Sequence, residues 1–198
     1  SEAGPSRETP VVRAVRKVRP AVVNIGSEYE VRYRSNPFSG FSRNPLFDEF
    51  FKDFFDRRFE RSQKRTSLGS GVIIDGKRGF TLTNAHVIAQ SGVIKITLND
   101  EREFTAEVVG ADPDSDLAVL RISSKTPLPS IAMGNSNDLM IGETVIAIGN
   151  PFGFSHTVTT GVISATERSI RTDDRVYHNF IQIDASINPG NSGGPLLK

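Results

Sequence analysis

Cysteine is absent from the 198-residue chain. This absence excludes disulfide bonds, a thiolate nucleophile and a zinc site built from cysteine thiolates. Packing alone must therefore stabilise the fold. The compartment in which the protein works is not determined by this absence.

Long apolar stretches and an excess of charge are missing as well. No run of about 18 apolar residues occurs, so we expect no helix that spans a membrane. The formal net charge is +1 at pH 7, which gives no reason to expect nucleic acid or an anionic membrane as a partner. No secretory signal stands at the start of the sequence, as expected if one had been removed from a mature form.

Short apolar runs between turn residues dominate the sequence after residue 67 and predict a β protein. Six predicted strands precede a linker at 124–129, which contains two prolines, and four strands follow it. We therefore expect a first unit over 1–123 and a second over 124–198. The predicted strands are 21–26, 71–74, 80–83, 93–98, 104–109 and 117–122, then 144–148, 157–165, 180–183 and 195–197.

One short helix is predicted near the N-terminus. Thr9 can cap this helix and Pro10 can occupy its first position. Valines at helical spacing give it an apolar stripe that ends before a proline. The stripe can cover the end of its own barrel or contact another subunit. Its members are Val11, Val12, Val15 and Val18.

A Phe-rich insertion at about 29–66 interrupts the strand pattern, and eight of the 13 phenylalanines lie between Phe38 and Phe59. Asn44 and Pro45 predict the start of a helix there. Five of its rings share one face, and burying each would contribute about 1.5–3 kcal/mol. This face can dock on another subunit, gate a site or pack on its own barrel; a disordered segment is the remaining alternative. The five are Phe47, Phe50, Phe51, Phe54 and Phe55.

The segment NPGNSGGP at 188–195 places a single serine among glycines. Glycine permits positive φ and close approach, so such a turn can direct several backbone N–H groups at one point. A serine nucleophile needs these donors for the oxyanion that its attack creates. We interpret Ser192 as a nucleophile, with Gly190, Asn191 and Ser192 forming the oxyanion hole. An ordinary turn with a solvated serine would use the same residue types.

A serine nucleophile also needs a base, and the base needs an orienting group. The segment GFTLTNAHVI is typical of a short alternating strand that ends in His86, and DSDLAVLRI places Asp116 in front of an apolar strand. Asp116 is preferred over Asp112 and Asp114 because it directly precedes the buried run. We interpret the other two as solvated turn carboxylates. The chain order His, Asp, Ser is that of chymotrypsin-type enzymes.

The motifs TNAHVI, DSDLAVLRI and NPGNSGGPLL resemble the three catalytic blocks of trypsin-like serine proteases, and their sequences are most similar to those of the HtrA/DegP/DegQ branch. The resemblance implies an all-β fold of two six-stranded antiparallel barrels of the chymotrypsin type, with the short N-terminal helix and the Phe-rich helical insertion. We expect the second barrel to be incomplete, because only four strands are predicted for it. The PDZ domains that follow the protease domain in this branch are absent from the sequence.

The resemblance also implies an activity. His86 would act as general base, Asp116 as its orienting group and Ser192 as nucleophile, without metal or cofactor. We expect a serine endopeptidase of protein quality control that degrades misfolded or unfolded polypeptides in the bacterial periplasm, after removal of a signal peptide. The branch implies a homotrimer or a multiple of trimers, with the insertion as its regulatory loop. The alternative is a chaperone-like or peptide-binding fragment in which the triad is not assembled.

Other positions carry narrower expectations. Asn191 replaces the aspartate of many trypsin-like enzymes, so activation by an ion pair to a new N-terminus is not expected. The charged segment 168–179 would be a sensor loop or a plain solvated loop. Ile187 would line the primary specificity pocket and favour small aliphatic side chains. His156 and His178 lack the spacing of a metal site, and we expect both at the surface.

Overall fold

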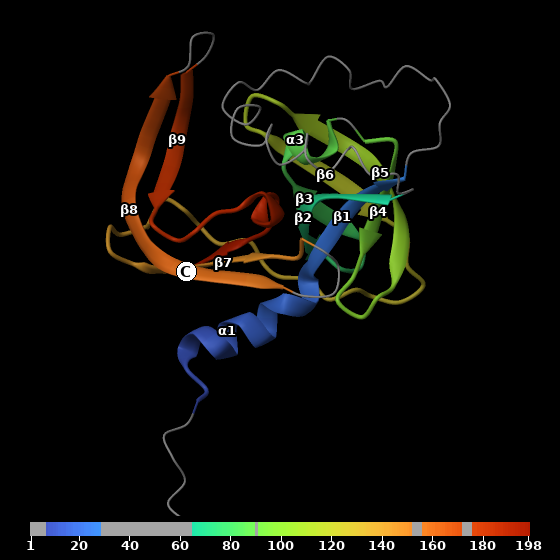
Figure 1. Ribbon diagram of the computed structural model, residues 1–198, viewed down its shortest axis with the longest axis horizontal. Coiled ribbons are helices and arrows are strands. Elements are labelled where there is room, and N and C mark those ends of the chain that lie inside the picture. Colours follow the sequence, from blue (N-terminus) through green and yellow to red (C-terminus); the bar gives the residue numbers. More distant parts are fainter. Residues whose placement is uncertain (1–6, 29–64, 90, 152–155, 172–175) are drawn as a thin grey trace, which may run out of the picture.

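The computed structural model describes residues 7–28, 65–89, 91–151, 156–171 and 176–198. Within these ranges the chain is mostly β, with one closed six-stranded barrel and one four-stranded sheet (Figure 1). The predicted helix of the Phe-rich insertion lies outside the described residues. No helix in the described ranges is long and apolar enough to cross a membrane.

The barrel contains the six strands predicted before the linker. Their order around the barrel is β1-β2-β3-β6-β5-β4, and an antiparallel pairing of β1 with β4 closes it. The second strand begins earlier than predicted, because β1 pairs with it as far as Glu28↔Arg65 and draws a polar, glycine-containing stretch into the sheet. The strands are β1 Val22–Glu28, β2 Arg65–Asp75, β3 Phe80–Thr83, β4 Val93–Thr97, β5 Glu103–Asp112 and β6 Leu117–Ile122.

Branched aliphatic side chains fill the barrel. Each strand directs alternate residues inward, as the burial of Ile94 and Ile96 in β4 shows. Burying each such side chain contributes about 1.5–3 kcal/mol, so the barrel forms a rigid support for residues at its edges. The largest fully buried members of this core are Ile25, Ile73, Ile96, Leu98, Leu120 and Ile122.

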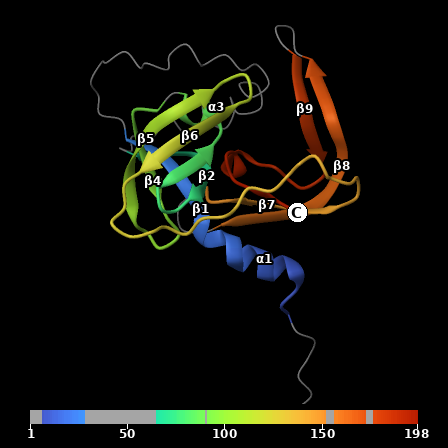
Figure 2. The same ribbon diagram turned by 180° about the vertical axis from the view of Figure 1, so that it is seen from behind.

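The C-terminal half contains the four strands predicted after the linker. They form an antiparallel sheet in the order β10-β7-β8-β9, and the described residues of this half form no second closed barrel. A long β8–β9 hairpin extends beyond the rest of the sheet, as both views of the ribbon show (Figure 2). The strands are β7 Thr144–Gly149, β8 Thr157–Arg171, β9 Val176–Ile183 and β10 Leu196–Leu197.

The prediction of a loop over 168–179 was wrong for 168–171 and 176–179, and residues 172–175 lie outside the described ranges. Strand β8 continues to Arg171 and β9 begins at Val176. Pairs such as Arg168↔Phe180 and Arg171↔Val176 hold the two strands together. Backbone pairing therefore overrides the polar composition that suggested a loop, because solvated side chains are compatible with both faces of an extended hairpin.

The N-terminal helix is confirmed as α1, Pro10–Val18, followed by a 3-10 turn, Arg19–Ala21. The Thr9 hydroxyl accepts the Val12 N–H at 3.3 Å, as its predicted capping role requires. Val12 itself is 38% exposed and was wrongly assigned to the apolar stripe. The helix packs on β7 of the C-terminal half and on Val22 at the start of the barrel strand β1. Contacts join Val11, Ala14, Val15 and Val18 to a cluster of Val22, Ile146 and Ile148, with Leu197 beside them.

Candidate active site

His86 lies in a short helix, α3, Ala85–Ile88, and not at the end of a strand as predicted. Strand β3 ends at Thr83, and Asn84 adopts an extended conformation at the N-cap position of α3. The apolar neighbours of His86 explain the helical turn. Val87 and Ile88 are buried, and winding the chain into a turn directs both into the core while His86 stays partly exposed.

Asp116 occupies the turn in front of β6 and has a φ of 53°. This left-handed conformation is uncommon for a residue with a side chain, although Asp tolerates it better than most. The Asp116 N–H closes the turn by donating to the Pro113 carbonyl at 3.3 Å. The residue is only 8% exposed, so its carboxylate is largely shielded from water.

The Asp116 carboxylate binds His86 in two places. Its Oδ1 accepts the His86 backbone N–H at 3.0 Å, and its Oδ2 lies 2.7 Å from His86 Nδ1. An ionised carboxylate can only accept hydrogen bonds, so Nδ1 carries the ring hydrogen and Nε2 of a neutral ring is left as an acceptor. A general base needs this tautomer, because it takes a proton through Nε2.

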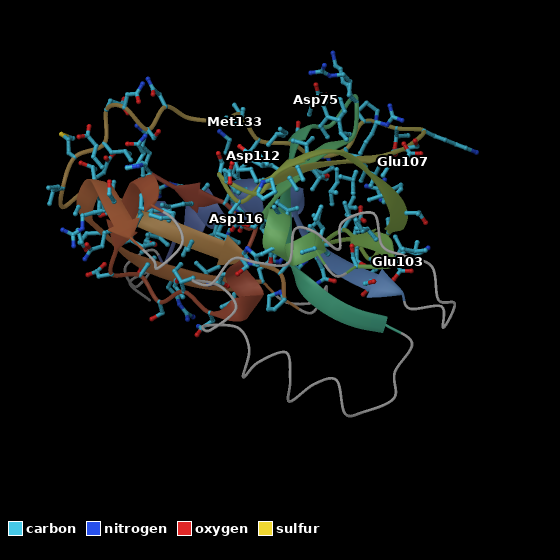
Figure 3. The ribbon with its side chains drawn as sticks, turned by 90° about the horizontal axis from the view of Figure 1, so that it is seen from above. Asp75, Glu103, Glu107, Asp112, Asp116 and Met133 are labelled. Atoms are coloured by element: carbon cyan, nitrogen blue, oxygen red, sulfur yellow. The ribbon has the colours of Figure 1, made fainter. Side chains whose placement is uncertain are left out.

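The backbone carbonyl of Asp116 holds the same segment from a second side. It accepts the Ala85 N–H at 3.2 Å and the Asn84 side-chain amide at 2.8 Å. Four hydrogen bonds therefore join residues 84–86 to Asp116. Figure 3 places Asp116 between the barrel and the orange C-terminal half, whereas Glu103 and Glu107 lie on the far side of the barrel.

Ser192 follows a 3-10 turn, Pro189–Asn191, which lies between the barrel and the β8–β9 hairpin (Figure 1). We call residues 188–193 the serine turn. The residue after Ser192, Gly193, has a φ of 83°. A Cβ at this position would overlap the Ser70 carbonyl oxygen and the Thr83 hydroxyl. Both the conformation and the space therefore require glycine directly after the serine.

Strand β2 anchors the serine turn to the barrel. The Ser70 N–H donates to the Ser192 carbonyl at 2.8 Å, and the Ser70 hydroxyl donates to the Gly190 carbonyl at 2.7 Å. The neighbouring Gly69 has the Ser192 carbonyl oxygen on one side and Val87 on the other. The fold therefore brings together the serine turn, the α3 helix and the Asp116 turn, which lie far apart in the sequence.

The backbone N–H groups of the turn are not equivalent. The Asn191 N–H donates to the Asn188 carbonyl at 2.8 Å. Among the hydrogen bonds of the described residues, none uses the N–H of Gly190 or Ser192 as donor. Of the three residues expected in the oxyanion hole, Gly190 and Ser192 therefore have donors that remain available to a ligand.

The Asn191 side chain is buried at 6% exposure and lies against Gly149. Neither atom of its amide has a hydrogen-bond partner among the described residues. A carboxylate at this position would be a buried charge without a cation, which is strongly unfavourable. The neutral side chain thus fits its surroundings.

Ile187 is 43% exposed and lies in the segment between β9 and the serine turn. Two hydrogen bonds fasten this segment to β8: the Val162 N–H donates to Asp184 Oδ1 at 2.6 Å, and the Thr159 hydroxyl donates to the Ser186 carbonyl at 2.8 Å. A separate cavity of about 430 Å³ adjoins the serine turn and is lined by Leu82, Met133 and Gly193, among others. Ile187 does not line that cavity.

The sequence analysis did not predict a cluster of three buried polar residues behind the serine turn. Asn24, Ser70 and Asn150 are buried, and Asn150 links the other two. The Asn24 amide donates to the Asn150 carbonyl at 2.8 Å, and the Asn150 N–H donates to the Ser70 hydroxyl at 2.7 Å. The available signal was the presence of polar residues within or directly after apolar strand patterns.

The remaining candidates divide into correct and incorrect predictions. Asp112 and Asp114 are exposed, as predicted, and hydrogen bonds from Ser115 and the Asp114 N–H lower the pKa of Asp112. His178 is exposed, also as predicted. The surface position predicted for His156 was wrong. Its Nε2 lies 3.2 Å from the carbonyl of Val22, the first residue of β1, and burial lowers the pKa of its ring.

An antiparallel barrel that carries a His–Asp pair beside a glycine-rich serine turn defines a trypsin-like β protein. The family model described as a trypsin-like peptidase domain matches residues 69–198, and the chain belongs to this family.

Several proteins are similar to most of the chain. A probable periplasmic serine endoprotease, DegP-like, from Halomonas elongata is 47% identical and covers 92% of the chain. A protein of the same description from Marinomonas sp. is 48% identical with the same coverage. The chain spans about 40% of the length of these relatives.

A solved structure described as the HtrA-type protease AlgW with decapeptide is also similar. It matches with a TM-score of 0.71 at 42% identity, covering 96% of this chain and 55% of its own. The resemblance to the HtrA/DegP branch is thereby confirmed.

Proposed function

We propose that the protein is a serine endopeptidase that acts through Ser192, His86 and Asp116. The observation that carries this proposal is the attachment of His86 to Asp116 through both the ring and the backbone, beside a serine turn fastened to the same barrel. The names of the relatives, serine endoproteases, support the same activity.

The first half of the proposed reaction forms an acyl-enzyme. Ser192 Oγ attacks the carbonyl carbon of the scissile peptide, and His86 Nε2 takes the hydroxyl proton. The N–H groups of Gly190 and Ser192 stabilise the negative oxygen of the tetrahedral intermediate. His86 then gives its proton to the leaving nitrogen as the C–N bond breaks, and the amine product departs.

The second half releases the remaining product. Water attacks the acyl carbon while His86 takes its proton, and the tetrahedral intermediate collapses with expulsion of Ser192 Oγ. The serine recovers the proton from His86, and a carboxylic acid leaves. Asp116 stays ionised throughout and stabilises the imidazolium that forms in each half.

The proposed substrates are unfolded polypeptides, because an extended chain can present a peptide bond to a partly exposed turn at the edge of two β units. The exposed Ile187 would contribute an apolar wall that favours small aliphatic side chains. The names of the relatives support a periplasmic location. We further propose a homotrimer or a multiple of trimers, as the HtrA resemblance implies.

A second candidate is a chaperone-like or peptide-binding fragment whose triad is not assembled. The four-stranded sheet of the C-terminal half favours this alternative, because the serine turn borders a sheet that is not closed into a barrel in the described residues. A misplaced oxyanion hole would remove much of the catalysis even with all three side chains present.

The deciding experiment is intact mass after incubation with a fluorophosphonate, which phosphonylates an activated serine. We expect one adduct on the parent protein and none on Ser192→Ala or His86→Ala. Cleavage of an unfolded substrate that Ser192→Ala abolishes would extend the result to peptides. A parent that takes no adduct and cleaves nothing would contradict the peptidase and favour the binding fragment.

A further inference from the structure

We propose that Ser70 is a positioning residue for the oxyanion hole, and that its hydroxyl sets the orientation of the Gly190–Asn191 peptide. This inference rests on the proposed peptidase activity. Ser70 belongs to the barrel strand β2 and has no exposed surface. It is therefore out of reach of a substrate and can act only through the residues it contacts.

Ser70 contacts both residues whose N–H groups are the proposed donors. Its N–H donates to the Ser192 carbonyl at 2.8 Å, and its hydroxyl donates to the Gly190 carbonyl at 2.7 Å. Its own carbonyl oxygen lies against Gly193. Ser70 thus contacts Gly190 before the nucleophile, the nucleophile Ser192 itself and Gly193 after it.

The hydroxyl has only one possible direction of donation. The Asn150 N–H donates to Ser70 Oγ at 2.7 Å, and an N–H group cannot accept. The single hydroxyl hydrogen of Ser70 is therefore left for the Gly190 carbonyl. Because Asn150 is itself fully buried, water does not compete readily for this arrangement.

The hydrogen bond from the Ser70 hydroxyl to the Gly190 carbonyl matters because glycine has little intrinsic preference for one peptide orientation. At one end of the Gly190–Asn191 peptide the carbonyl binds Ser70, and at the other the N–H binds the Asn188 carbonyl at 2.8 Å. Without the first bond this peptide can rotate. Rotation would displace the two adjoining peptides, which carry the Gly190 and Ser192 N–H groups, or would direct the Gly190 carbonyl oxygen at the position where the oxyanion develops, which is repulsive.

A purely structural role for Ser70 makes a different prediction. The hydroxyl also joins the barrel to the C-terminal half, so its loss would leave the Asn150 N–H and the Gly190 carbonyl without a partner and lower stability. A loss of stability alone changes the amount of folded protein but not the affinity of the folded protein for a transition-state analogue relative to a substrate. The test therefore compares these two affinities.

The variants are Ser70→Ala and Ser70→Cys, which lack a strong donor, and Ser70→Thr, which keeps the hydroxyl. Ser27→Ala is the matched control, because it also removes a buried serine hydroxyl from a barrel strand, one that accepts the Gly92 N–H at 2.9 Å. Each variant is assayed with a peptide substrate for kcat and KM, and with a peptide boronate, which forms a tetrahedral adduct with the serine. Thermal unfolding is measured in parallel.

We expect kcat and boronate affinity to fall together by about 10- to 100-fold in Ser70→Ala and Ser70→Cys, with KM little changed. The Ser70→Thr variant should keep most of both, and Ser27→Ala should lose stability but retain kcat. The pH profile should keep its position, because the His–Asp pair is not altered.

The inference is overturned if Ser70→Ala or Ser70→Cys keeps the parent kcat and boronate affinity, or if Ser27→Ala loses both to the same degree. A parent that takes no fluorophosphonate and binds no boronate would instead contradict the peptidase activity itself, and the inference with it.

Discussion

The side-chain amide of Asn84 donates to the backbone carbonyl of Asp116 at 2.8 Å. The residue two positions before His86 is therefore fastened to the residue that holds the His86 ring. Asp116 has a φ of 53°, a conformation that its neighbours must maintain. The Asn84 bond is one of the contacts that do so.

Removing this amide should weaken catalysis more than stability. In Asn84→Ala the carbonyl keeps the Ala85 N–H as one partner, so the fold should survive. The Asp116 carboxylate should lose part of its alignment, and kcat/KM should fall about 10-fold. Steady-state kinetics with thermal unfolding as a control tests this prediction. Equal kcat/KM in parent and variant would show that Asn84 has no positioning role.

Replacing the orienting carboxylate should have a much larger effect. Asp116→Asn places an amide where two donors of His86 need an acceptor, so the ring is held in the wrong tautomer. The expected loss in kcat is about 10⁴-fold at neutral pH, as for the Ser-His-Asp triad in general. Asp112→Asn is the control, because Asp112 is exposed and should leave kcat unchanged. A smaller effect at Asp116 than at Asp112 would refute the assignment.

Alanine at Gly193 should destabilise the serine turn. The residue has a φ of 83°, and a Cβ would meet the Ser70 carbonyl oxygen and the Thr83 hydroxyl. Strain and overlap together predict a loss of about 2–5 kcal/mol in the free energy of unfolding. Gly134→Ala is the matched control, because a Cβ there has open space. Chemical denaturation measures both, and similar values for the two variants would contradict the prediction.

His156 should make stability depend on pH. Burial lowers the pKa of its ring below the ordinary value of 6.5, so the unfolded chain binds the proton more readily than the folded one. The contribution of His156 is therefore fully present above pH 6.5 and declines as the pH falls from 6.5 through the lower folded-state pKa. Urea unfolding on both sides of this value should show a steeper acid loss for the parent than for His156→Gln. An identical slope in parent and variant, with the exposed His178→Gln as reference, would contradict this.

Local patterns in the sequence were sufficient for the strands and for α1. Alternating apolar residues marked β4 and β6, and the Thr9–Pro10 pair marked the start of the helix. These signals lie within a few residues of the element that they predict, so they can be recognised without knowledge of the fold. The three motifs likewise identified the residues of the proposed triad.

Contacts between distant parts of the chain were not predictable in this way. Ser70 and Gly190 are 120 residues apart, and no local pattern pairs their oxygens. The sequence around His156 indicates no partner for its ring, which lies against Val22 at the start of the barrel. The segment 168–179 reads as a loop until its partner strand is known. For Ser70 and His156 the deciding interaction arises only when the two halves meet, and for 168–179 it arises when β8 pairs with β9.

The division of the site between two β units has a consequence for inactivation. His86 and Asp116 both belong to the closed barrel, whereas Ser192 belongs to the C-terminal half and reaches the barrel through Ser70. Loosening the seam between the halves would therefore withdraw the nucleophile and leave the proton-handling pair intact. The proposed enzyme would lose its activity at temperatures at which the barrel is still folded. The activity would return on cooling, when the two halves pack together again.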